Sequence, residues 1–121
     1  MNQTTPHDWL EVREKYRAHQ HFKNGRFDVM IGIADFIIDS KLDTKFLPLF
    51  SHGTLSIFPA QVDTDSDYYI RINPLKFGLV DMELIRRFEG NDAIVDRSSA
   101  EGPAVISDLK FMLQKIDTIN I

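Results

Sequence analysis

The clearest structural signal in the chain is the stretch FDVMIGIADFIIDS at residues 27–40. Its apolar residues recur at the three- and four-residue spacing of an α-helix and cover most of the helix surface. One narrow strip of that surface is not apolar. The strip contains Asp28, Gly32, Asp35 and Asp39, and Asp43 continues the spacing beyond the helix. A helix that is apolar on nearly all sides belongs inside a fold, so residues 27–40 are predicted to form the central helix.

A first helix is predicted upstream of this stretch. Thr5 suits the N-cap, Pro6 suits the first helical position, and Asp8 adds negative charge in the first turn. The dipeptide Asn24-Gly25 is a strong helix breaker and ends the segment.

Downstream, the pattern changes to the two-residue period of β-strands. Strands are predicted at residues 46–50, 54–58 and 68–72, and Ser51-His52-Gly53 is the expected turn of a hairpin. Pro48 makes the first of these strands an edge strand or a loose extended segment, because proline cannot donate a ladder hydrogen bond.

Residues 75–88 fit two patterns. Alternation favours short strands, whereas another set of apolar residues has helical spacing. The members of that set are Leu79, Met82, Ile85 and Phe88. A short helix over residues 81–88 with Asp81 as N-cap is the preferred prediction. A short strand at 93–95, a loop at 98–102 and a terminal helix that opens at Pro103 complete the layout.

This order of elements predicts an α+β fold. The 121 residues are expected to form a single domain, 1–121, in which a small antiparallel sheet packs against three to four helices. A chain of this length supports one hydrophobic core.

Charge and composition exclude several functional classes. The chain has 14 Lys and Arg, 18 Asp and Glu, a net charge of −4 and no Cys. Without Cys, disulfide scaffolds, Cys-ligated zinc, iron–sulfur clusters and thiol nucleophiles are excluded. The acidic balance gives no electrostatic reason to bind nucleic acid or an anionic membrane. No signal peptide is visible, and the longest apolar run, 29–38, is too short to span a bilayer, so a cytoplasmic location is expected.

Motifs for catalysis or for metal binding are not found in the sequence. It has no G-x-S-x-G elbow and no phosphate-binding glycine loop. His19 and His21 would point apart on a helix. Residues 63–67 begin like a calcium loop, but Tyr68 and Pro74 stand where that loop needs Gly and Glu. We therefore expect a protein that is not an enzyme, with no catalytic residues, no metal site and no cofactor.

The acid strip, defined as Asp28, Asp35 and Asp39, has no basic residue inside its helix. Like charges one turn apart disfavour a helix slightly. Three interpretations stay open: a solvated strip, an acidic ridge that meets a basic partner, or salt bridges to arginines elsewhere. The candidate arginines are Arg13, Arg17 and Arg86.

A second acidic group precedes a tyrosine pair. It consists of Asp63, Asp65 and Asp67, followed by Tyr68 and Tyr69. A plain acidic turn is one interpretation. Tyrosines also supply contact area and hydrogen bonds at interface hot spots, so these residues and the acid strip are the predicted partner-binding residues. A later stretch, 83–96, mixes acids with arginines, as solvated salt-bridged surfaces do.

In size, acidity, lack of Cys and α+β layout, the chain resembles the small immunity proteins of bacterial contact-dependent growth inhibition and polymorphic toxin systems. The residues behind the resemblance are the acid strip, the segment 63–69 and the stretch 83–96. The resemblance implies a cytosolic inhibitor that binds a cognate basic toxin domain of the nuclease type, one to one. These proteins share no motif, so no functional residue is carried over.

Two other functional classes stay open. A small enzyme or ligand-binding domain would have a pocket between sheet and helices, and its polar groups would come from Asp35, His52, Tyr69 and Arg71. A regulatory subunit would dimerise through the apolar stripe of the last helix, so a homo-oligomer is possible.

Overall fold

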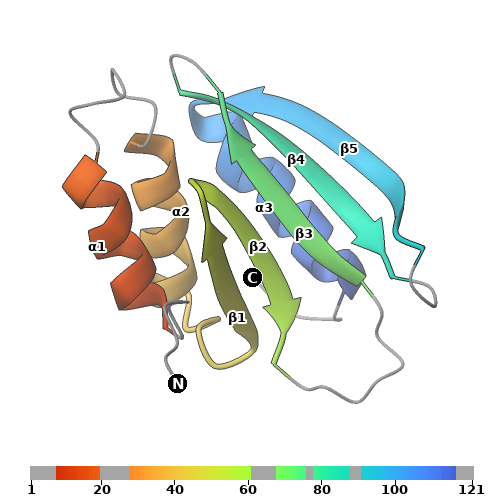
Figure 1. The fold of residues 1–121 in the computed structure, drawn as a ribbon, viewed down its shortest axis with the longest axis horizontal. Coiled ribbons are helices and arrows are strands. Elements are labelled where there is room, and N and C mark those ends of the chain that lie inside the picture. The colour runs from red at the N-terminus through yellow and green to blue at the C-terminus, as the bar shows by residue number, and fades with distance from the viewer. Residues whose placement is uncertain (1–7, 20–27, 61–67, 76–77, 88–90, 117–121) are drawn as a thin grey trace.

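The computed structural model describes residues 8–19, 28–60, 68–75, 78–87 and 91–116. Within these ranges the chain forms three helices and five strands (Figure 1). The helices are α1 (Trp9–His19), α2 (Asp28–Asp39) and α3 (Pro103–Ile116). The strands are β1 (Phe46–Ser51), β2 (Thr54–Pro59), β3 (Tyr68–Pro74), β4 (Leu79–Arg86) and β5 (Ala93–Glu101). The α+β class is therefore confirmed, with a larger sheet than predicted and three helices in the described part of the chain.

The five strands form one antiparallel sheet in the order β1-β2-β3-β4-β5. β1 lies at one edge, as Pro48 predicts, and β5 lies at the other. His52 and Gly53 join β1 to β2 with φ angles of 53° and 87°. Two central residues with positive φ are typical of the type I′ turn, whose twist matches that of a hairpin.

The core lies between one face of the sheet and the three helices. It contains buried residues of β2, β3 and β4 together with the inner sides of α1, α2 and α3. α3 lies behind the sheet, and α1 and α2 lie beside β1 (Figure 1). Two hydrogen bonds attach α1 to the first hairpin: Trp9 Nε1 donates to the carbonyl of Phe46, and the Tyr16 hydroxyl donates to the carbonyl of Gly53, each at 2.9 Å.

The prediction of a short helix at residues 81–88 is wrong for the part that is described, because Leu79–Arg86 is strand β4. Val80, Met82 and Leu84 are buried on the core side, and Ile85 is buried on the opposite face. A strand with apolar residues on both faces shows no clean alternation, so its apolar spacing imitates a helix.

The predicted loop at 98–102 is also wrong, since β5 continues to Glu101. β5 is a polar edge strand, so its residues lack the β-branched and aromatic signal of a central strand. α3 opens at Pro103 as predicted. Thr5 and Pro6 lie outside the described residues, and Asp8 caps α1 by accepting the Glu11 N–H at 2.8 Å.

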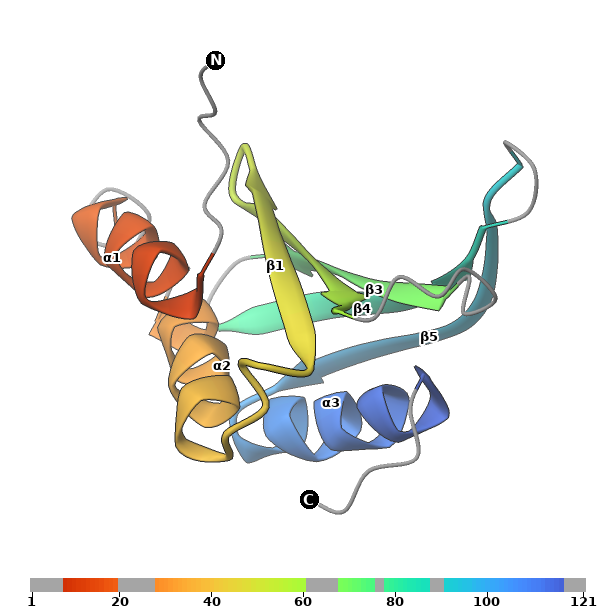
Figure 2. The ribbon, with the colours of Figure 1, turned by 90° about the horizontal axis from the view of Figure 1, so that it is seen from below.

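The sheet is curved. Figure 2 shows that the β1–β2 hairpin and the beginning of β5 both turn away from α3, which lies on the other side. No described helix lies on the inner side of this curve. We call this side the uncovered face.

Candidate protein-binding surface

The uncovered face carries every second side chain of the strands, because successive strand residues point to opposite faces. Strand register arranges these side chains in three rows that cross all five strands. The apolar row is Leu47, Phe58, Tyr69, Ile85 and Ile94. The charged row is Leu49, Ser56, Arg71, Glu83 and Arg97. The polar row is Ser51, Thr54, Asn73, Asp81 and Ser99.

The apolar row is buried in its middle and exposed at its ends. Tyr69 and Ile85 are 8% and 1% exposed, although neither belongs to the main core cluster. Leu47 and Ile94 at the two ends are 43% and 48% exposed. The row is therefore a second apolar layer on the side of the sheet away from α3, and its ends are accessible to another molecule.

The apolar row contains an aromatic pair, Phe58 and Tyr69. Arg87, which follows β4, and Asp92, which precedes β5, both contact this pair. The rings of Phe58 and Tyr69 stack with centroids 4.7 Å apart. Arg87 lies over both rings, 5.3 and 5.7 Å from their centroids. The Tyr69 hydroxyl donates to Asp92 Oδ2 at 3.0 Å. Burial and this hydrogen bond raise the pKa of Tyr69.

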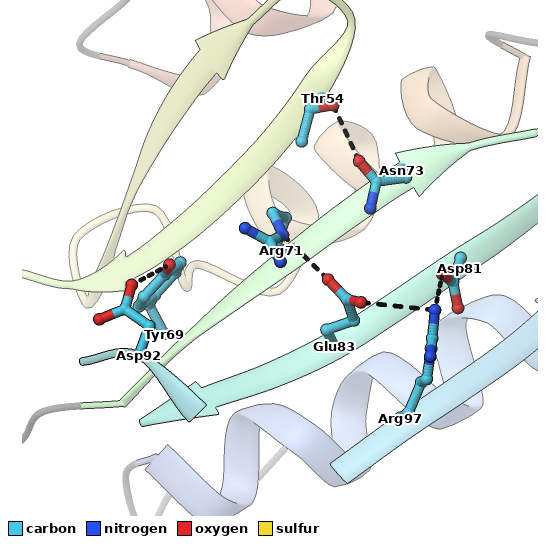
Figure 3. Close-up of polar contacts among 8 residues, drawn as sticks. All are labelled: Thr54, Tyr69, Arg71, Asn73, Asp81, Glu83, Asp92 and Arg97. Atoms are coloured by element: carbon cyan, nitrogen blue, oxygen red, sulfur yellow. Dashed lines mark hydrogen bonds and ion pairs between the residues drawn. The ribbon is translucent and has the colours of Figure 1, made fainter. Parts of the chain in front are cut away.

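The charged row contains a buried carboxylate between two arginines (Figure 3). Glu83 Oε1 accepts from Arg71 Nε at 2.9 Å, and Glu83 Oε2 lies 3.6 Å from Arg97 Nη2. The same Nη2 lies 3.2 Å from Asp81 Oδ2. The hydrogen bond to Asp81 and the two carboxylate charges raise the pKa of Arg97. Burial of Glu83 depends on these guanidinium groups, since an unpaired buried carboxylate is costly.

Two further hydrogen bonds link the polar row. Thr54 Oγ1 donates to Asn73 Oδ1 at 2.9 Å (Figure 3), and Ser99 Oγ donates to Asp81 Oδ1 at 3.4 Å. Side-chain bonds therefore join β2 to β3, β3 to β4 and β4 to β5 on this face. These bonds order the side chains of the uncovered face relative to one another.

The acid strip lies on α2, away from the uncovered face. Asp35 Oδ1 accepts from Arg13 Nη1 at 2.9 Å, so for Asp35 the structure shows a salt bridge between α2 and α1. Asp28 is in the first turn of α2, where the helix dipole favours a carboxylate. Asp39 is exposed at the last residue of α2, where the dipole disfavours it.

The tyrosine pair is divided between the two faces of the sheet. Tyr69 is on the uncovered face, whereas Tyr68 packs against the core and has Arg86 5.9 Å from its ring centroid. Asp63, Asp65 and Asp67 lie outside the described residues. Among the predicted partner-binding residues that the structure describes, only Tyr69 lies on the uncovered face.

Strand register groups Phe58, Arg71, Glu83 and Arg97 with Tyr69 on one face. From the sequence, Arg71 was named only for an enzyme or ligand site, and the other three were not named as partner-binding residues. The helix predicted at 81–88, and a strand predicted only over 93–95, hid the pairing of Glu83 with Arg97. Neither strand alternates cleanly enough to give a clear local signal. Strand assignments at both places put Glu83 and Arg97 on one face.

The polar groups named for an enzyme are not gathered at one place. Asp35 lies between α1 and α2, His52 is exposed in the β1–β2 turn, and Tyr69 and Arg71 lie on the uncovered face. The apolar stripe of α3, which was considered for dimerisation, packs mostly into the core. Four of its residues are buried there. They are Val105, Leu109, Met112 and Leu113.

Among the described residues, no three His, Cys, Asp or Glu side chains are grouped so that they could hold a metal ion. In the same part of the chain, no helix is both long enough and apolar enough to cross a membrane. Comparisons with protein-family models, curated proteins and solved structures found no match.

Proposed function

We propose that this chain is a protein-binding inhibitor that holds one partner protein against the uncovered face of its sheet. The observation that carries the proposal is the apolar row, which crosses five strands on a face that no described helix covers. Apolar and aromatic side chains beside arginines are typical of the centre of protein–protein interfaces.

The ordering of this face before binding also supports the proposal. The Glu83 carboxylate is fixed by two arginines, and Tyr69 is fixed by Asp92 and Arg87. Side chains that are already ordered lose little conformational entropy when a partner binds. The face therefore suits tight binding without any catalytic group.

In its finer form the proposal is an immunity protein that neutralises a cognate basic toxin domain of the nuclease type. The net charge of −4 would attract such a partner at long range. Asp39 and Asp43, at and just beyond the end of α2, are both exposed. The unfavourable position of Asp39 on the helix dipole is consistent with a role in attracting a basic partner.

Co-expression with the product of the neighbouring open reading frame tests the proposal. We expect a one-to-one complex in size-exclusion chromatography and an affinity measurable by calorimetry. Ile94→Lys, at an exposed end of the apolar row, should weaken binding at least about tenfold. Leu10→Lys is the matched control, because Leu10 is 53% exposed on α1.

The two parts of the proposal fail separately in this experiment. Equal binding by the two lysine variants would contradict the uncovered face as the docking surface. Reversal of Asp39 and Asp43 to Lys should slow association at low salt and change dissociation little. An unchanged association rate would contradict electrostatic attraction of a basic partner. The absence of any complex would contradict the inhibitor proposal.

A further inference from the structure

We infer that Arg71 and Arg97 on the uncovered face bind a carboxylate of the partner, carried by an acidic residue with apolar neighbours. The inference rests on the proposed function, because both place the partner on this face. It adds that the partner's contact with these arginines is acidic, although the partner as a whole is expected to carry a net positive charge.

Another molecule can reach only some of the charged side chains on this face. The side chains of Arg71 and Arg97 are 40% and 62% exposed, whereas that of Glu83 between them is 7% exposed. The side chain of Asp81 is 16% exposed. The guanidinium groups are therefore outermost and the carboxylates lie beneath them. A partner that approaches the charged row meets hydrogen-bond donors.

Both arginines have N–H groups that take no part in these contacts with carboxylates. Within the described part of the chain, Arg71 donates through Nε to Glu83, and Arg97 uses Nη2 for both of its carboxylates. Arg71 has no buried nitrogen without a partner, and the side chain of Arg97 is 62% exposed. Their remaining N–H groups are therefore open to water. A partner that displaces this water must supply acceptors, and a carboxylate matches the guanidinium fork best.

The apolar row lies beside the arginines, so the partner's carboxylate needs apolar neighbours. Tyr69 of the apolar row is two residues from Arg71 on the same face, and such positions are about 7 Å apart. An acidic side chain bound at Arg71 thus has apolar neighbours that lie over this row, whose accessible residues are the half-buried Phe58 and the exposed Leu47 and Ile94. A protein segment provides this combination.

Charge balance on the face argues against a polyanion. The arginines of this face among the described residues are Arg71, Arg87 and Arg97. Among the same residues, the face carries four carboxylates, namely Asp81, Glu83, Asp92 and Glu101. Nucleic acid binding depends on a surplus of positive charge along the phosphate backbone. A single carboxylate can instead bind the outer guanidinium groups without a net positive surface.

Nuclear magnetic resonance of the full ¹⁵N-labelled chain tests the inference without the natural partner. The probe is an acetylated octapeptide of alternating Leu and Glu, with matched Leu-Gln and Leu-Lys peptides and inorganic phosphate as comparisons. We expect saturable shifts of the Arg71 and Arg97 Nε–Hε signals with the Glu peptide. Affinity for the Gln peptide should be at least about tenfold lower.

Three variants make the test specific. Arg97→Gln should weaken binding of the Glu peptide at least about tenfold. Arg71→Lys, which keeps a positive charge beside Glu83, should also weaken it because lysine lacks the bidentate fork. Arg17→Gln is the matched control, since Arg17 is 49% exposed on α1 and pairs with Glu14.

Several results would overturn the inference. They are equal binding of the Glu and Gln peptides, preference for the Lys peptide, phosphate binding as tight as that of the Glu peptide, or no saturable shift at either arginine. The failure of the proposed function is distinguishable. A complex with the neighbouring gene product that Ile94→Lys weakens, but Arg97→Gln and Arg71→Lys leave unchanged, refutes the carboxylate contact alone. Binding of the Glu peptide without such a complex refutes the inhibitor proposal alone.

Discussion

Of the three ion pairs among the described residues of the uncovered face, Arg71–Glu83 and Arg97–Asp81 have the shortest contacts, and they should contribute unequally to stability. The Arg71–Glu83 contact is 2.9 Å long, and the Glu83 side chain is 7% exposed. At an effective dielectric constant of about 20, the attraction across this distance is about 6 kcal/mol. The cost of burying Glu83 and the 40% exposure of Arg71 cancel most of that attraction. We expect a net coupling free energy of about 1–2 kcal/mol for this pair.

The Arg97–Asp81 contact is weaker on each of these counts. It is 3.2 Å long, and Arg97 is 62% exposed. Exposed pairs of this kind contribute little to the free energy of unfolding, because water and salt screen the two charges. The predicted order of coupling is therefore Arg71–Glu83 above Arg97–Asp81.

Double-mutant cycles measured by urea unfolding provide the assay. One cycle uses Arg71→Gln and Glu83→Gln, and the other uses Arg97→Gln and Asp81→Asn. At about 1 M salt, where screening acts beyond about 3 Å, the Arg97–Asp81 coupling should vanish and most of the Arg71–Glu83 coupling should remain. Equal couplings, or equal losses in salt, would show that Glu83 is hydrated and refute the description of a buried carboxylate.

Three further predictions concern single side chains. Tyr69→Phe should cost about 1 kcal/mol of unfolding free energy through loss of the bond to Asp92, while Tyr68→Phe, the matched control, should cost less in the same urea titration. Burial raises the pKa of Tyr16, so the folded state retains a proton that the unfolded state releases above about pH 10. Stability should therefore fall as pH rises beyond about 10, and Tyr16→Phe should reduce that slope in unfolding measured at several alkaline pH values. Asp8→Ala removes the N-cap of α1 and should lower the free energy of unfolding by about 1 kcal/mol, measured as a lower Tm. An unchanged Tm would mean that this cap does not contribute to the stability of the fold.

Local patterns predicted the elements in which the spacing of apolar residues matches one kind of secondary structure. α2 has its apolar residues at helical spacing, and the β1–β2 hairpin has alternation and a Gly53 turn. Both were predicted close to their observed bounds. β4 was mistaken for a helix because its burial depends on two layers, one of them made by Tyr69 and its neighbours. The spacing of apolar residues within β4 gives no information on where that second layer lies.

The candidate surface was harder to predict for a related reason. Tyr69 was identified from its own chemistry and its acidic neighbours. Arg71, Glu83 and Arg97 become one group only through the register of three strands. Each of them alone is an ordinary surface charge. Asp35 is the opposite case. Its charge suggested contact with another protein, but it forms a salt bridge with Arg13 of the same chain.

The consecutive strand order has a consequence for the kinetics of folding. Every strand pairs only with its neighbours in sequence, so each pairing closes a short loop at a small entropic cost. Sheets built this way have low contact order and are expected to fold faster than sheets with crossed connections. The contacts of Trp9 and Tyr16 with the first hairpin span 37 residues. We expect the sheet to grow hairpin by hairpin and α1 to dock late, so that changes in α1 speed unfolding and leave the folding rate nearly unaltered.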